Sequence, residues 1–122
     1  MKILIVEDNE LQRKLLEELL KADGFEIIVA DSGITALEIL KTYTPELIVS
    51  DIVMPLMDGF EFAKIIKSGE YKTIPFLIYS SRYPPDDDDV ELAYIYGIDR
   101  YLNAVGMQGV KDEVMHFLNN KK

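Results

Sequence analysis

Short apolar runs rich in isoleucine and valine alternate along the chain with longer stretches that have helical periodicity. The runs have the length and composition of buried strands, and their predicted bounds are Lys2–Glu7, Phe25–Ala30, Glu46–Asp51, Pro75–Ser80 and Arg100–Asn103. This alternation predicts repeated strand–helix units and a parallel sheet. Because strand–helix–strand crossovers are right-handed, we expect helices on both faces of the sheet.

The stretches between the strands carry apolar residues three and four positions apart, as amphipathic helices do. In the first stretch the apolar face is predicted to comprise Leu11, Leu15, Leu16 and Leu19. Two prolines and an acidic run come after the fourth strand, so a loop and then a short helix from about Asp89 to Tyr96 are expected there.

Polar residues and glycines mark the expected helix ends. Gly24 stands where the first helix should stop, and Ser32 can cap the second helix. Asp58, followed three residues later by Glu61, has the spacing of a capping box and predicts the start of the third helix.

The composition fits one domain spanning residues 1–122, because 48% hydrophobic residues suffice for a core without disulfides or a structural metal. The chain has no cysteine, which excludes disulfides and thiolate metal sites. A formal net charge of −9 opposes direct binding to nucleic acid. No signal peptide or membrane span is predicted, so we expect a soluble, cytoplasmic protein.

Acidic residues close the first and third predicted strands. Glu7 and Asp8 end one strand and Asp51 ends the other. Carboxyl ends of parallel strands meet at one edge of a sheet, where three carboxylates would repel one another without a cation. Mg²⁺ is the natural occupant, since it accepts carboxylate oxygens and keeps water at its other positions. Singly, Asp8 or Asn9 could instead cap the first helix, and Asp51 could begin a turn.

Four pieces of sequence occur in the order and at the separations of a known family: "MKILIVEDNE", "LIVSDIVMPLMDG", the strand-ending Ser80 and "YGIDRYL". Together they resemble the receiver domain of two-component response regulators over essentially the whole chain. The resemblance implies an α/β fold with a five-stranded parallel sheet in the order 2-1-3-4-5, doubly wound by five helices and flavodoxin-like. It also implies a signalling module of a phosphorelay and not an ordinary enzyme.

The resemblance assigns roles to the acidic residues. Asp51 matches the aspartate that accepts a phosphoryl group from a histidine kinase or a phosphotransfer protein. Glu7 and Asp8 match the acidic pair that holds Mg²⁺, and Asp51 and the backbone carbonyl of Val53 are the further ligands implied. The metal would offset the charge of the phosphoryl oxygens while Asp51 attacks in line.

Two further matches concern the switch between signalling states. Ser80 matches the hydroxyl residue that hydrogen-bonds the transferred group, and Tyr101 matches an aromatic residue whose ring then moves inward. Outside the family, Ser80 could simply satisfy backbone at a strand end, and Tyr101 could be half-buried on an edge strand. The family presents its fourth helix, fifth strand and fifth helix to a downstream protein or output domain, and a homodimer is possible.

The sequence departs from the family pattern after the fifth strand. Ala104 stands where the family has a lysine that pairs with the acceptor aspartate, and Val105 stands where a proline usually follows. A unit charge pair at ~4 Å is worth about 4 kcal/mol at an effective dielectric near 20, so the loss should matter. Arg82 on the preceding loop, or Lys111 in the last helix, could supply the charge instead.

The missing lysine leaves a second function open: a degenerate receiver that binds protein partners or dimerises without phosphorylation. A phosphatase or a flavin carrier on the same topology is disfavoured. Val53 replaces the second aspartate that such a phosphatase needs, and the loop "EDNEL" lacks donors for a flavin phosphate. The lone His116 receives no catalytic role. The cognate kinase and output, and whether the chain stands alone, stay open.

Overall fold

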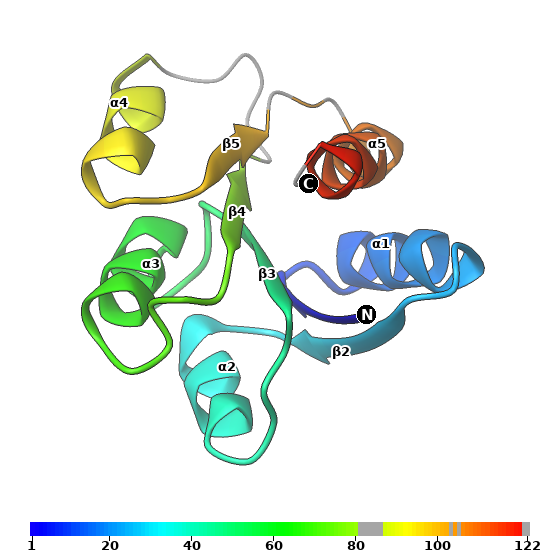
Figure 1. The fold of residues 1–122 in the computed structure, drawn as a ribbon, viewed down its shortest axis with the longest axis horizontal. Coiled ribbons are helices and arrows are strands. Elements are labelled where there is room, and N and C mark those ends of the chain that lie inside the picture. Colours follow the sequence, from blue (N-terminus) through cyan, green and yellow to red (C-terminus); the bar gives the residue numbers. More distant parts are fainter. Residues whose placement is uncertain (81–86, 103, 105, 121–122) are drawn as a thin grey trace.

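The computed structural model describes residues 1–80, 87–102, 104 and 106–120. Strands and helices alternate along this part of the chain (Figure 1). The elements are β1 (Lys2–Val6), α1 (Glu10–Ala22), β2 (Glu26–Ala30), α2 (Gly33–Leu40), β3 (Leu47–Asp51), α3 (Gly59–Ser68), β4 (Phe76–Tyr79), α4 (Asp87–Ile95), β5 (Arg100–Leu102) and α5 (Gly106–Asn119).

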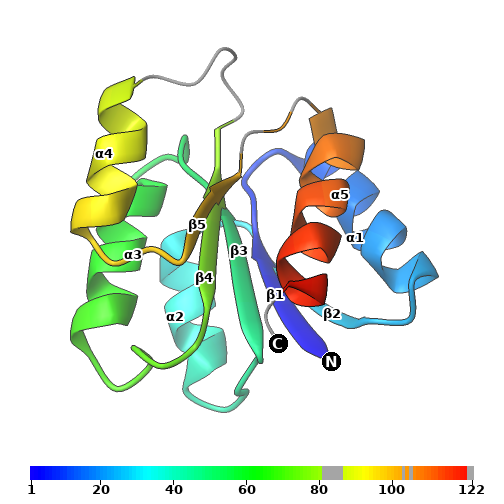
Figure 2. The same ribbon diagram turned by 45° about the horizontal axis from the view of Figure 1, so that its top comes forward.

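The strands form one parallel sheet in the order β2-β1-β3-β4-β5, which confirms the predicted topology. In register, Val6 of β1 lies beside Ser50 of β3, and Asp51 of β3 lies beside Tyr79 of β4. All the strands therefore end at the same edge of the sheet, which is the upper edge in Figure 2. The last residues of β1, β3 and β4 are brought together there.

Helices cover both faces of the sheet, as the crossover rule requires. Figure 1 shows α2, α3 and α4 on one face and α1 and α5 on the other. Side chains along a strand alternate between the two faces. Leu4 and Val6 of β1 enter the core under α2 and α3, whereas Ile3 and Ile5 enter the core under α1 and α5.

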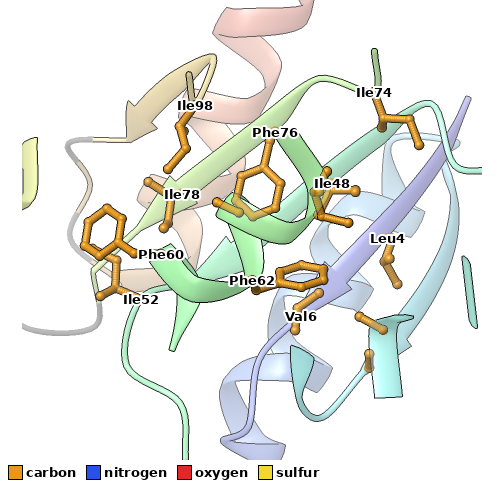
Figure 3. Packing of buried hydrophobic residues seen from close by; sticks show 14 of the residues in the cluster. Leu4, Val6, Ile48, Ile52, Phe60, Phe62, Ile74, Phe76, Ile78 and Ile98 are labelled. Carbon is orange, nitrogen blue, oxygen red and sulfur yellow. The ribbon is translucent and has the colours of Figure 1, made fainter. Parts of the chain in front are cut away.

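The core under α3 is built around aromatic rings, as Figure 3 shows. Phe62 of α3 packs on Phe76 of β4 with ring centroids 5.5 Å apart, and both side chains are fully buried. Burying one such side chain stabilises the fold by about 1.5–3 kcal/mol. This packing holds α3, and the loop that precedes it, against the end of β3.

The apolar face predicted for α1 is only partly correct. Leu16 and Leu20 are buried and Leu19 packs against them, but Leu11 and Leu15 are exposed by 77% and 48%. With ~3.6 residues per turn, Leu11 lies on the opposite side of the helix from Leu20. The four leucines counted in the sequence therefore wrap around the helix, and two of them face away from the sheet.

Several element ends differ from prediction by one or two residues. Helix α4 begins at Asp87 and ends at Ile95, whereas Asp89 and Tyr96 were predicted. Strands β1 and β4 stop one residue early, so Glu7 and Ser80 follow their strands instead of ending them. Asp51 is the last residue of β3, as predicted.

The predicted caps of α2 and α3 are present. Ser32 accepts a hydrogen bond from the backbone N–H of Thr35, and Asp58 and Glu61 form both bonds of a capping box. At α1 the cap is Asn9, whose side-chain oxygen accepts from the Gln12 N–H at 2.9 Å. Among the described residues, none of the helices combines the length and apolarity needed to cross a membrane.

Candidate functional site

The three predicted acidic residues meet at the carboxyl edge of the sheet. Because β1 and β3 are neighbours, Glu7 after β1 lies close to Asp51 at the end of β3. Glu7, Asp8 and Asp51 each offer a carboxylate oxygen, and these atoms lie within 4.8 Å of one another. Glu7 and Asp51 are 0% and 1% exposed, whereas Asp8 reaches solvent. We call these three residues the acidic cluster.

Local backbone geometry places the members of the cluster. Asn9 caps α1, so the Asp8 carboxylate is not needed there. The backbone N–H of Asn9 donates to Oε2 of Glu7 at 3.0 Å and holds that side chain inward. Arg13 in α1 donates to the backbone carbonyl of Glu7 at 3.0 Å, which ties the first turns of α1 to the end of β1.

The loop between β3 and α3 holds Asp51 in place. The N–H of Val53 donates to Oδ1 of Asp51 at 3.3 Å, and the N–H of Gly59 donates to the carbonyl of Ile52 at 2.8 Å. A Cβ on Gly59 would overlap the backbone carbonyl of Asp51, so only glycine allows α3 to begin so close to β3. The position of Asp51 is thus fixed by backbone packing as well as by its strand.

Glu7 makes a second hydrogen bond that crosses the site. The hydroxyl of Tyr79, at the end of β4, donates to Oε1 of Glu7 at 2.6 Å. Both partners are buried. Together with the bond from Asn9, this contact leaves neither carboxylate oxygen of Glu7 without a donor.

Burial is the main cause of an unusual protonation equilibrium at Glu7. The pKa of Glu7 is raised from 4.5 to about 7: burial and the nearby charges of Asp51 and Asp8 raise it, while the bonds from Tyr79 and Asn9 lower it. The pKa of Tyr79 is raised well above its ordinary value, first by burial and then by Glu7. The phenol therefore stays protonated at neutral pH and acts as a donor.

The acidic cluster fits a hard divalent cation. All three side chains present carboxylate oxygens, which are the ligands that Mg²⁺ takes together with water. A cation would also relieve the repulsion that raises the pKa of Glu7. The backbone carbonyl of Val53, two residues after Asp51, stays a predicted ligand.

The predicted switch residues lie close to this edge. Ser80 directly follows Tyr79 at the end of β4. Tyr101 lies in the edge strand β5, paired with Ile78 of β4, and its half-buried ring packs against the core under α3 and α4. Their predicted movements on phosphorylation stay predictions.

A comparison with known families decides what kind of domain this is. The model of the response regulator receiver domain matches residues 3–104. The chain belongs to this family. Receiver domains are signalling modules of two-component systems that interact with histidine kinases and downstream partners. The resemblance inferred from the sequence is confirmed.

Individual relatives agree with the receiver assignment. The polar-differentiation response regulator DivK of Brucella ovis is 43% identical over 68 residues, and this match covers 56% of the chain and 55% of DivK. The match thus spans just over half of that relative's length.

Solved receiver structures share the fold. The Mn²⁺-bound form of response regulator Rcp1 is 26% identical, with a TM-score of 0.82 over 98% of this chain and 92% of that one. The phosphorylated cyanobacterial phytochrome response regulator RcpA is 26% identical, with a TM-score of 0.84 over 99% and 95% of the two chains.

In this receiver domain, Ala104 occupies the position predicted for the lysine. It packs against the core under α1 and α5, the same core that holds Tyr79 and Met107. Lys111, one of the two suggested replacements, pairs instead with Asp23 at 3.0 Å, at the C-terminal end of α1 and away from the acidic cluster. The other suggestion, Arg82, and the proline position Val105 lie outside the described residues.

Tyr79 contacts the acidic cluster, and the sequence analysis did not predict it. It was counted only as part of an apolar strand. A usable signal was present, because a tyrosine among buried aliphatic residues needs a polar partner for its hydroxyl. The sequence could not say that this partner is Glu7, which is 72 residues away in the chain.

Proposed function

We propose that this receiver domain binds Mg²⁺ at the acidic cluster and accepts a phosphoryl group on Asp51 from a histidine kinase or a phosphotransfer protein. The observation that carries the proposal is the convergence of Glu7, Asp8 and Asp51 oxygens within 4.8 Å at the carboxyl edge of the sheet. Two relatives of the same fold support it, since Rcp1 has a Mn²⁺-bound form and RcpA has a phosphorylated form.

In the proposed transfer, an oxygen of the Asp51 carboxylate forms a bond to phosphorus while the bond from phosphorus to the donor histidine nitrogen breaks. The leaving imidazole takes the electron pair of that bond and a proton. When bound, Mg²⁺ supplies positive charge beside the transferred oxygens. Glu7 and Asp8 would hold the ion, the Val53 N–H helps to orient Asp51, and the hydroxyl of Ser80 would bond the transferred group.

The switching step of the proposal is altered by Ala104. Without an ammonium group at this position, the phosphorylated Asp51 has one fewer positive partner, and the loop after β5 is not drawn toward it by an ion pair. A specific observation therefore favours a second function, a degenerate receiver whose protein contacts do not depend on phosphorylation. Both functions make the domain a signalling module and not an ordinary enzyme, at most one that catalyses its own phosphorylation and dephosphorylation.

The proposed partner surface is the face made by α4, β5 and α5. It carries apolar side chains on α4 that reach solvent: Val90, Tyr94 and Ile95 are exposed by 45%, 87% and 63%. Apolar groups gathered on one helix are a usual feature of protein interfaces. A downstream protein, an output domain or a second copy of the chain would bind here, in the cytoplasm.

The two functions are separated by incubation with acetyl phosphate or phosphoramidate and Mg²⁺, followed by intact mass measurement. Phosphorylation predicts one added phosphoryl group in the wild-type protein, none in Asp51→Asn, and none when EDTA replaces Mg²⁺. Asp31→Asn is the matched control, because Asp31 follows β2 at the same edge but is not part of the acidic cluster. An adduct that persists in Asp51→Asn, or no adduct in the wild type, would refute the phosphorylation proposal.

A further inference from the structure

The side chain of Tyr79 takes an unusual path across the site. In the sheet order, β3 lies between β4, which carries Tyr79, and β1, which precedes Glu7. The hydroxyl nevertheless reaches Oε1 of Glu7 at 2.6 Å. The ring belongs to the core under α1 and α5, so the phenol spans the end of β3 on that face, next to Asp51 in register. Tyr79 thus bridges the strands on either side of the acceptor.

The same part of the core contains the position at which the lysine is missing. Ala104 packs against the core residues that include Tyr79, Leu102 and Met107. In the part of the chain that the structure describes, Tyr79 places a neutral phenol on this side of the acidic cluster, where the family pattern has an ammonium group. A phenol supplies one hydrogen bond and no charge.

We propose that Tyr79 is a positioning residue of the metal site, whose hydroxyl takes over from the absent lysine as a donor to the acidic cluster and orients the Glu7 carboxylate for a divalent cation. This inference rests on the proposed Mg²⁺ binding. It concerns Glu7, whose two carboxylate oxygens are both held by donors, the Asn9 N–H on Oε2 and the Tyr79 hydroxyl on Oε1. Carboxylates held in this way bind metal with less loss of side-chain freedom.

The neutral donor has a consequence that a lysine would not have. An ammonium group beside the cluster would repel the incoming cation, whereas the phenol orients Glu7 without opposing positive charge. The phenol stays protonated because burial and the neighbouring Glu7 raise the pKa of Tyr79. Tyr79 therefore supports metal binding and itself adds no charge that would compensate the phosphoryl group.

A purely structural tyrosine makes a different prediction. If the hydroxyl only fills the core and meets a convenient acceptor, its removal lowers the stability of the protein with and without metal equally. The affinity for the metal then stays the same. Tyr79→Phe keeps the ring, removes only the hydroxyl and separates the two roles.

The test is calorimetric titration of the wild type, Tyr79→Phe and the control Tyr43→Phe with MgCl₂ at pH 8. Tyr43 is a suitable control because its hydroxyl also lies near a glutamate, Glu26 at 3.4 Å, far from the cluster on the outer strand β2. Loss of a group that orients a metal ligand typically weakens metal binding ~10–100-fold. We expect the Kd for Mg²⁺ to rise at least about tenfold in Tyr79→Phe and to be unchanged in Tyr43→Phe.

The outcomes separate this inference from the function on which it rests. A wild-type protein that takes up no Mg²⁺ overturns both. A wild type that binds Mg²⁺ with a Tyr79→Phe variant within twofold of it overturns only the role of Tyr79. In the Glu7→Gln background, Tyr79→Phe should change the Kd less than twofold, and a further tenfold loss would show that Tyr79 does not act through Glu7. If Tyr79→Phe does not fold, Tyr79→Met, which also lacks the hydroxyl, carries the same outcomes.

Discussion

The buried Glu7 carboxylate should make the stability of the metal-free protein depend on pH in an unusual direction. Its pKa is about 7 in the folded protein, against an ordinary value of 4.5. Below pH 4.5 the group is protonated in both states and costs nothing. As the pH rises through 7, the folded state must hold a buried charge on Glu7. The stability that depends on a protonated Glu7 is therefore lost with rising pH and not with acid.

The size of this pH effect follows from the two pKa values of Glu7. They differ by about 2.5, and each pKa unit is worth ~1.36 kcal/mol, so ionisation of Glu7 should cost the folded state about 3 kcal/mol. By the same linkage relation, most of this, on the order of 2–3 kcal/mol, should be lost between pH 5 and pH 8. The substitution Glu7→Gln removes the titrating group but keeps an acceptor oxygen for Tyr79 and Asn9.

The assay is urea unfolding of both proteins in EDTA at half-unit steps from pH 5 to pH 8. The free energy of unfolding of the wild type should fall relative to that of Glu7→Gln by about 2–3 kcal/mol over this range. Taking the difference removes the effect of the carboxylates that lie away from the acidic cluster. Glu38→Gln is the control, because its side chain is 67% exposed and the substitution should leave the pH profile of the wild type intact. If the free energies of unfolding of wild type and Glu7→Gln changed in parallel with pH, the raised pKa of Glu7 would be refuted.

Three further substitutions test the packing that supports the site. Gly59→Ala puts a Cβ onto the backbone carbonyl of Asp51 and should cost about 3 kcal/mol in urea unfolding, so a loss below ~1 kcal/mol would contradict the close approach of α3. Asp58→Ala removes the side-chain oxygen that accepts from the Glu61 N–H and should lower stability by ~1 kcal/mol, with no effect if the cap is replaced by water. Lys67→Met leaves Asp99 without the ammonium group that lies 2.8 Å away and should lower the free energy of unfolding by about 1–3 kcal/mol. Adding Asp99→Asn to this variant should then cost little more. If the losses of the two single substitutions simply add, the ion pair does not contribute to stability.

The sheet and the acidic cluster could be predicted because their signals are local. Each strand is a short apolar run, and parallel strands bring their carboxyl ends to one edge. Once β1 and β3 were taken as neighbours, Glu7 and Asp51 had to lie close together. The prediction needed no knowledge of side-chain packing.

The prediction for α1 was wrong or incomplete where tertiary packing determines the structure. The apolar pattern of α1 did not fix its rotation, since five leucines surround the helix and the sheet buries only the side with Leu16 and Leu20. The choice between Asp8 and Asn9 as the cap depended on the exact turn after β1, and the structure assigns it to Asn9.

The bond between Tyr79 and Glu7 could not be predicted because it depends on tertiary distance. It requires that β4 lie two positions from β1 in the sheet and that the phenol be long enough to span β3. Neither condition leaves a mark near Tyr79 in the sequence. Ala104, by contrast, was noticed at once, since it interrupts a motif.

We propose above that Asp51 accepts a phosphoryl group at a magnesium site that it shares with Glu7 and Asp8. A crystal structure grown with Mg²⁺ and beryllofluoride tests it most directly, because beryllofluoride imitates a phosphoryl group on an aspartate. We expect beryllofluoride bound to Asp51, one Mg²⁺ between it and both other carboxylates, and the Tyr79 hydroxyl still bonded to Glu7. An ion bound elsewhere, or an unmodified Asp51 at saturating beryllofluoride, would contradict it.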